Sequence, residues 1–192
     1  MRWLTLYARS RQVPASIAAT LVGAAAIWGL ARTTEGAGPV GAGTAALLLT
    51  WAVAVSAIGL SGQDPALDRT AAIRWAPRRA AHVLLIGLFA GGVLAGLQAT
   101  AGDPARAGFV IRDIAGLTGL AAIAATLFAG QFGWTLPFAW FAIALFVPPA
   151  TDVPVQVATW MLQPPGTPAA TWTALLLAAI GTAAYTLRGS RR

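Results

Sequence analysis

Long apolar runs alternate with short polar stretches along almost the whole chain. The runs cover residues 13–31, 44–60, 80–100, 114–130, 135–150 and 169–187. Each holds 16 to 21 residues, close to the ~20 residues that a helix needs to cross the hydrocarbon core of a bilayer. The pattern predicts an all-α, polytopic membrane protein in which residues 1–192 form one transmembrane domain of six helices.

The longest polar interval, residues 61–79, separates the second and third runs. Its sequence favours a short helix, because Asp64 can accept hydrogen bonds as an N-cap and Pro65 suits the first helical position. Leu67 and Ile73 would then form an apolar edge beside the charged side chains. We expect this interval to be the best surface for a soluble partner. Its charged residues are Asp64, Asp68, Arg69, Arg74, Arg78 and Arg79.

A second unusual interval, residues 151–168, lies before the last run. It has one charge, Asp152, and is broken by four prolines. Such a stretch does not suit a full transmembrane helix. We expect Val155 to Leu162 to form a short helix that lies in the interface or dips into the bilayer, with Trp160 as its interfacial anchor. Position and prolines also suggest an outer gate formed by Val155, Trp160, Met161 and Leu162.

The composition agrees with a membrane protein. Of 192 residues, 57% are hydrophobic and 10% charged, with a mean hydropathy of +0.69, whereas soluble domains are ~25% charged. All thirteen basic residues are arginines that flank the apolar runs, so the net charge of +7 indicates membrane-flanking charge rather than nucleic-acid binding. The chain has no cysteine, which excludes disulfides and thiolate metal sites.

The arginines also predict an orientation, because arginine and lysine concentrate on the cytoplasmic side of a membrane protein. With six spans, both termini, the 61–79 loop and the 131–134 turn share one side. That side holds ten of the thirteen arginines, and the other holds Arg32, Arg106 and Arg112. The distribution predicts cytoplasmic termini and an outer position for residues 151–168.

Small residues suggest where the helices pack. Gly92 and Gly96 are four residues apart in the third run, and small side chains fill the fourth run over residues 116–125. Faces of small residues let helix backbones approach closely in lipid. We expect both stretches to form helix contacts.

Few residues in this chain suggest catalysis. His82, the single histidine, is expected at the membrane surface. Gly59 to Gly62 match the GxSG pattern of rhomboid-type intramembrane proteases, but His82 lies too close in sequence to pair with Ser61 inside a bundle. Arg112 and Asp113 are expected at the interface, at the start of the fourth span. With no lysine and no GxxxxGK[ST] loop, ATP binding of that kind is excluded, so we expect neither an enzyme nor a cofactor site.

Several segments together resemble one family. They are DPALDRTAA (64–72), RWAPRRAAHVLL (74–85), IRDIAGLTGLAAIAATLFAG (111–130), WMLQP (160–164) and AAYTLRGSRR (183–192). With the six predicted spans, they resemble the membrane permease subunits of bacterial ABC transporters of the ABC-2 type, in particular those of high-GC bacteria. The resemblance covers most of the chain and is largely topological.

The resemblance implies a permease subunit in a bacterial cytoplasmic membrane. It implies pairing with a separate ATPase subunit that binds ATP, and a homodimer or a heterodimer with a related permease. It also implies that the loop between spans two and three couples to the ATPase. Candidate coupling residues are Asp64, Leu67, Asp68, Arg69, Ile73 and Arg74.

Only the span interiors bear on the direction of transport and on the transported compound. Their lack of charge suggests export of an amphipathic or hydrophobic compound such as an antibiotic or peptide. Two rivals remain open. One is a membrane anchor or assembly subunit of another complex, and the other, less favoured, is an intramembrane enzyme.

Overall fold

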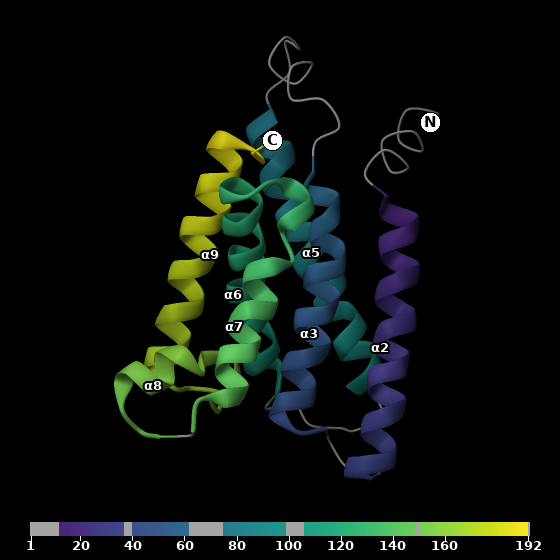
Figure 1. Ribbon diagram of the computed structural model, residues 1–192, viewed down its shortest axis with the longest axis vertical. Coiled ribbons are helices and arrows are strands. Elements are labelled where there is room, and N and C mark those ends of the chain that lie inside the picture. Colours follow the sequence, from purple (N-terminus) through teal and green to yellow (C-terminus); the bar gives the residue numbers. More distant parts are fainter. Residues whose placement is uncertain (1–11, 37–39, 62–74, 99–105, 149, 192) are drawn as a thin grey trace.

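The computed structural model describes residues 12–36, 40–61, 75–98, 106–148 and 150–191. Within these ranges every regular element is helical (Figure 1). The long helices are α2 (Val13–Glu35), α3 (Ala42–Ala57), α5 (Trp75–Gln98), α6 (Arg106–Leu127) and α9 (Pro168–Arg188). The short elements are η1 (Ile58–Leu60), η2 (Gly130–Phe132), α7 (Thr135–Phe146), α8 (Val153–Ala158) and η3 (Trp160–Leu162).

Among the described residues, five helices are long and apolar enough to cross a membrane: Val13–Glu35, Ala42–Leu60, Trp75–Gln98, Ala107–Leu127 and Pro168–Arg188. The fifth predicted span corresponds to α7, which has 12 residues. Twelve residues extend ~18 Å as an α-helix, less than the ~30 Å hydrocarbon core. The helix stops at Phe146 because Pro148 follows and disfavours helical geometry in the residue before it.

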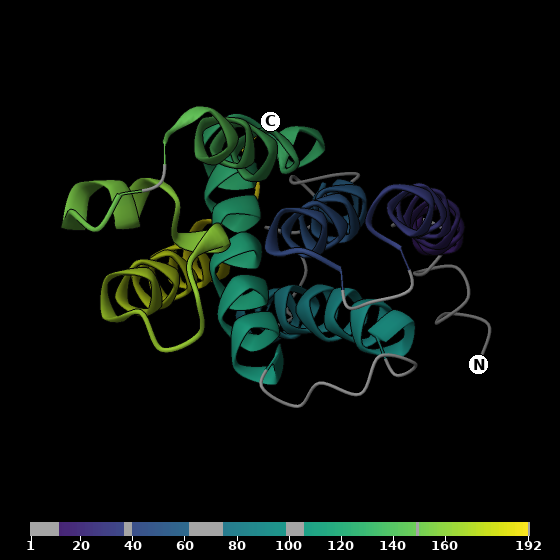
Figure 2. The ribbon, with the colours of Figure 1, turned by 90° about the horizontal axis from the view of Figure 1, so that it is seen from below.

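Helix α6 forms the centre of the bundle and contacts α3, α5, α7 and α9 (Figure 2). Its residues 116–122 are all buried, as the small side chains of this stretch predict. The closest approach is to α9, where a methyl group on Gly119 would lie 2.2 Å from the Leu177 carbonyl oxygen, and one on Gly181 would lie 2.1 Å from the Gly119 carbonyl oxygen. These two glycines therefore let the backbones of α6 and α9 touch directly.

The prediction for Gly92 and Gly96 is wrong. A methyl group added to either would meet no atom within 4 Å. On the same helix it is Gly87 and Gly91 that face a neighbour, because each receives the side chain of Ile114 from α6. The contact face of α5 thus carries Gly87 and Gly91 and is rotated away from Gly92 and Gly96.

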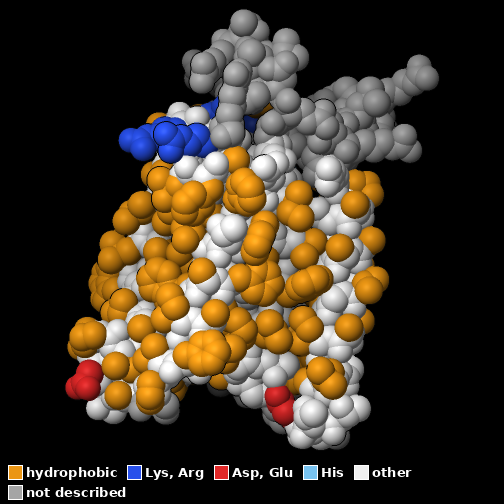
Figure 3. All heavy atoms as spheres, viewed as in Figure 1, with side chains coloured by type: hydrophobic (Ala, Val, Ile, Leu, Met, Phe, Trp, Pro, Cys, Tyr) orange, Lys and Arg blue, Asp and Glu red, His pale blue; other side chains and the backbone are white. Residues whose placement is uncertain are grey.

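Charged side chains separate along the long axis of the bundle. Arg78 and Arg79 lie near the start of α5, Arg188 ends α9 and Arg191 follows it; we call this the arginine end. Glu35 ends α2, and Asp152 precedes α8 at the opposite end. Figure 3 shows basic side chains at the top of this face, acidic ones at the bottom and a largely apolar wall between them. Such a wall is the surface expected of a protein that lies in lipid.

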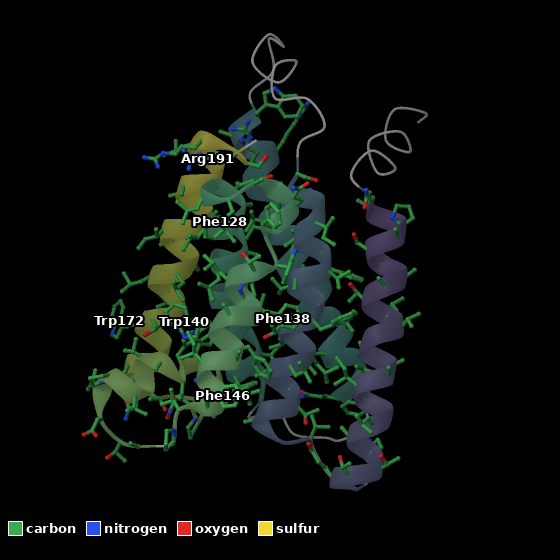
Figure 4. The ribbon with its side chains drawn as sticks, in the orientation of Figure 1. Phe128, Phe138, Trp140, Phe146, Trp172 and Arg191 are labelled. Atoms are coloured by element: carbon green, nitrogen blue, oxygen red, sulfur yellow. The ribbon has the colours of Figure 1, made fainter. Side chains whose placement is uncertain are left out.

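Contacts at the arginine end tie the last helix to the centre. The backbone N–H of Arg191 donates to the Ala125 carbonyl oxygen at 3.1 Å, and its guanidinium donates to the Leu127 carbonyl oxygen at 3.3 Å. These carbonyls belong to the last turn of α6, which lacks partners within its own helix. The tail that follows α9 therefore caps α6 (Figure 4, Arg191).

Candidate functional site

A buried ion pair lies inside α6. Arg112 is 7% exposed and Asp113 is fully buried, and Arg112 Nε donates to Asp113 Oδ1 at 2.8 Å. The prediction that both residues lie at the start of the fourth span is wrong, because α6 begins at Arg106 rather than near residue 114. The pair therefore sits about two turns into the helix.

The guanidinium of Arg112 also reaches across to a distant part of the chain. Its Nη1 donates to the Pro164 carbonyl oxygen at 3.0 Å, and its Nη2 to the Gln163 carbonyl oxygen at 2.9 Å. Pro164 and Pro165 have no backbone N–H, so this turn has fewer backbone donors of its own than an ordinary segment. An arginine, with five N–H groups in a planar fork, is well suited to bonding two successive carbonyls.

Local contacts compensate the charge of Arg112. Its guanidinium carbon lies 5.1 Å from the centre of the Phe109 ring, a cation–π distance, and Asp113 supplies the opposite charge. An isolated charge in a low-dielectric interior costs several kcal/mol, and pairing with full hydrogen bonding offsets that cost. The second carboxylate oxygen of Asp113 is buried and has no hydrogen-bond partner.

The chain between α7 and α9 folds back against α6. We call residues 153–165 the return segment; it contains α8, η3 and the Pro164–Pro165 turn. Trp160 is fully buried, and a methyl group on Gly116 would lie 2.3 Å from its ring. The expected interfacial anchoring by Trp160 is therefore wrong, because the indole fills a notch that Gly116 leaves in α6.

The four predicted gate residues differ in burial. Met161 is fully buried like Trp160, whereas Val155 and Leu162 are half-buried. Trp140 of α7 holds the segment from the other side, because its Nε1 donates to the Ala158 carbonyl oxygen at 2.9 Å (Figure 4). The return segment is thus fixed to both α6 and α7.

The predicted coupling residues lie outside the described residues. They are Asp64, Leu67, Asp68, Arg69, Ile73 and Arg74. The described neighbours of this loop, the end of η1 and the start of α5, both lie at the arginine end (Figure 1). The loop is therefore connected to the bundle at the end opposite the return segment.

Three helices line a groove of about 720 Å³. Its walls come from α5, α6 and α9 and are largely apolar, with Gln98, Thr118 and Thr182 as the polar side chains. A smaller cavity of about 180 Å³ lies where Gln98 and Phe109 approach Gln163 and Pro164 of the return segment. Volumes of the larger kind suit a drug-sized apolar ligand.

The described part of the chain offers no group of three or more side chains that could hold a metal ion. Ser61 of the GxSG stretch donates from its hydroxyl to the Ile58 carbonyl oxygen at 2.8 Å, and His82 lies on α5.

Sequence reasoning missed the role of Arg112 and Asp113. Their adjacency inside an otherwise apolar stretch was the available signal, since charged residues in transmembrane helices usually face the bundle interior and pair with one another or with backbone carbonyls. The predicted fourth span, residues 114–130, excludes the pair, because adjacent charges at the end of an apolar run favour the interface over the span interior.

Comparison with protein-family models, curated proteins and solved structures finds no match to this chain. Function is therefore inferred from the geometry of the chain itself.

Proposed function

We propose that this chain is the permease subunit of an ATP-driven exporter of the ABC-2 type. The observation that carries the proposal is the return segment, a hydrophobic kinked stretch between α7 and α9 that is buried against α6. Such a stretch before the last span is part of the ABC-2 resemblance seen in the sequence. A segment that folds back at one end of the bundle, with a charged loop at the other end, suits a transporter in which ATP hydrolysis on the cytoplasmic side opens a gate on the outer side.

The proposed topology has six crossings, with both termini and the 62–74 loop in the cytoplasm of a bacterial cell. The arginine end is then the inner end, in agreement with the preference of arginine for that side. Helix α7 is the fifth of these crossings. Its 12 residues do not reach the full thickness alone, and η2 with the following turn completes its path toward the arginine end.

The energy source is proposed to lie in a partner. A separate ATPase subunit binds and hydrolyses ATP, and it contacts the segment that contains Asp64, Leu67, Asp68, Arg69, Ile73 and Arg74. The permease acts as a homodimer or a heterodimer with a related chain. The absence of lysine and of a phosphate-binding loop from the sequence supports this division of labour.

The proposed cargo is an amphipathic or hydrophobic compound, such as an antibiotic or peptide. The groove between α5, α6 and α9 supports this class, because its walls are mostly Gly, Ala, Val, Leu and Ile. A strongly charged substrate would lose its hydration there without gaining a partner.

Copurification from the native membrane tests the proposal. We expect an ABC-type ATPase to accompany the tagged chain, and the charge reversal Asp68→Arg/Arg69→Asp to release it without lowering the amount of inserted protein. Asp152→Arg, an acidic-to-basic change at the opposite end of the bundle, is the matched control and should keep the ATPase bound. Retention of the ATPase by the charge reversal would refute the coupling role, and a stable partner of another kind would favour a membrane anchor.

A further inference from the structure

The turn at the end of the return segment receives two hydrogen bonds from α6. Gln163 and Pro164 offer two successive carbonyls to one guanidinium, at 2.9 and 3.0 Å. Thr167 also bonds to the Pro164 oxygen, through its hydroxyl at 3.0 Å. The contact to Arg112 is therefore what joins this turn to α6, while the contact to Thr167 joins it to the start of α9.

The anchor on α6 is itself held in place. Asp113 engages Arg112 Nε, which leaves the two terminal nitrogens pointing at the turn. Bidentate contacts of this kind fix direction as well as distance. An arginine without its carboxylate would be a buried net charge, so the two residues act as one unit.

Packing adds a second contact a short distance along the segment. Trp160 enters the notch at Gly116, one turn beyond Asp113 on α6. Because Gly116 has no side chain, the indole of Trp160 packs against the backbone of α6. This contact is one of burial and includes no directional bond. The polar contact at Arg112 therefore supplies the directional bonds between the segment and α6, in addition to the bond from Trp140 of α7.

We propose that the Arg112–Asp113 pair is a latch that holds the return segment closed against α6, and that breaking it lets the segment open as a unit. A role for the latch in gating export rests on the proposed function. Its role in controlling access to buried residues such as Met161 does not. Arg112 is in this sense a positioning residue for the segment.

Cysteine modification tests the latch directly, because the chain has no natural cysteine. Met161→Cys places a thiol on the return segment where the side chain is fully buried, and Ala125→Cys places one in the α6 core near the arginine end, also fully buried. In lipid nanodiscs both faces of the protein are open to a soluble maleimide, so the result does not depend on orientation.

The main variant is Arg112→Leu/Asp113→Leu, which removes both charges together and leaves no unpaired ion. We expect modification of the cysteine at position 161 to become at least about tenfold faster, because the two charge-assisted bonds to the turn are lost. Modification at position 125 should not change. Arg112→Lys keeps the charge without the planar fork and should give a smaller increase at position 161 only.

Arg32→Leu is the matched control. It removes an arginine at the same end of the bundle whose guanidinium bonds to the Gly36 carbonyl oxygen beside its own helix, and it should leave both rates unchanged. An unchanged rate at position 161 in both latch variants would overturn the proposal. An equal increase at position 125 would overturn it too, because the pair would then support the whole bundle rather than one segment.

The two proposals fail separately. Faster modification at position 161 without a copurifying ATPase would support the latch and refute the exporter function. A copurifying ATPase with unchanged modification at position 161 would support the exporter function and refute the latch.

Discussion

The hydroxyl of Tyr185 donates a hydrogen bond of 2.9 Å to the carbonyl oxygen of Leu60, 125 residues earlier in the chain. Both residues are buried. Leu60 ends η1, just before the 62–74 loop, and Tyr185 lies in the last turn of α9. The bond therefore joins the residues that precede the loop to the final helix. Gly130 packs against the next residue, Ser61, because a methyl group on Gly130 would lie 2.3 Å from the Cα of Ser61.

Tyr185→Phe should lower the free energy of unfolding by about 1–3 kcal/mol, because it leaves a buried carbonyl without this donor. Thermal unfolding of the purified protein in detergent measures the change. Trp172→Phe, a change of ring at a position 65% exposed, is the control and should have little effect. Equal stability of the two variants would contradict the importance of the Tyr185 bond.

Gly119→Ala should destabilise the fold by about 1–3 kcal/mol or more, since its methyl group would collide with the backbone of α9 at Leu177 and overpacking costs this much. Gly96→Ala makes the same chemical change at a site with no atom within 4 Å, and it should be neutral or slightly stabilising. The comparison is read from the amount of folded protein and its unfolding temperature. A larger loss of stability for Gly96→Ala than for Gly119→Ala would show that Gly92 and Gly96, rather than Gly119, form the main helix contact.

Trp160→Ala should cost about 3–5 kcal/mol, because a fully buried indole is replaced by a cavity. Trp172→Ala removes an indole that faces outward from α9 (Figure 4) and should cost much less. Chemical denaturation in detergent distinguishes them. If the two substitutions had equal effects, Trp160 would be a surface anchor, as its sequence context first suggested.

The proposed orientation predicts opposite labelling of two single-cysteine variants in intact cells. Asp152→Cys, on the exposed approach to α8, should react with a membrane-impermeant maleimide. Ser190→Cys, just after α9, should react only after the membrane is permeabilised. Labelling of position 190 in intact cells would invert the topology and remove the inner position of the arginine end.

The helices were predictable because their main determinant is local. A run of ~20 apolar residues must satisfy its backbone hydrogen bonds internally in lipid, and the α-helix does this within one segment. Helix ends were less predictable. Helix α6 starts at Arg106 and includes Arg112 and Asp113, since a charged residue can stay in a helix when another segment bonds to it.

The packing faces could be predicted only in part. The stretch 116–125 was identified because small residues fill every face of the helix there, so no rotation could hide them. The pair Gly92 and Gly96 occupies one narrow face of α5, and which face meets α6 depends on the neighbouring helices. The buried position of Trp160 likewise depends on a gap at Gly116, 44 positions away in the sequence.

By itself, the order of apolar and polar residues determined that this is a helical membrane protein with most of its arginines beside the membrane-crossing runs, because hydrophobic length and flanking charge act within one segment. The tertiary structure decided which side chains are buried together, above all that Arg112 and Asp113 hold the Gln163–Pro164 turn. That contact joins residues 51 and 52 positions apart, so it depends on how the helices pack together and not on any single segment of the sequence.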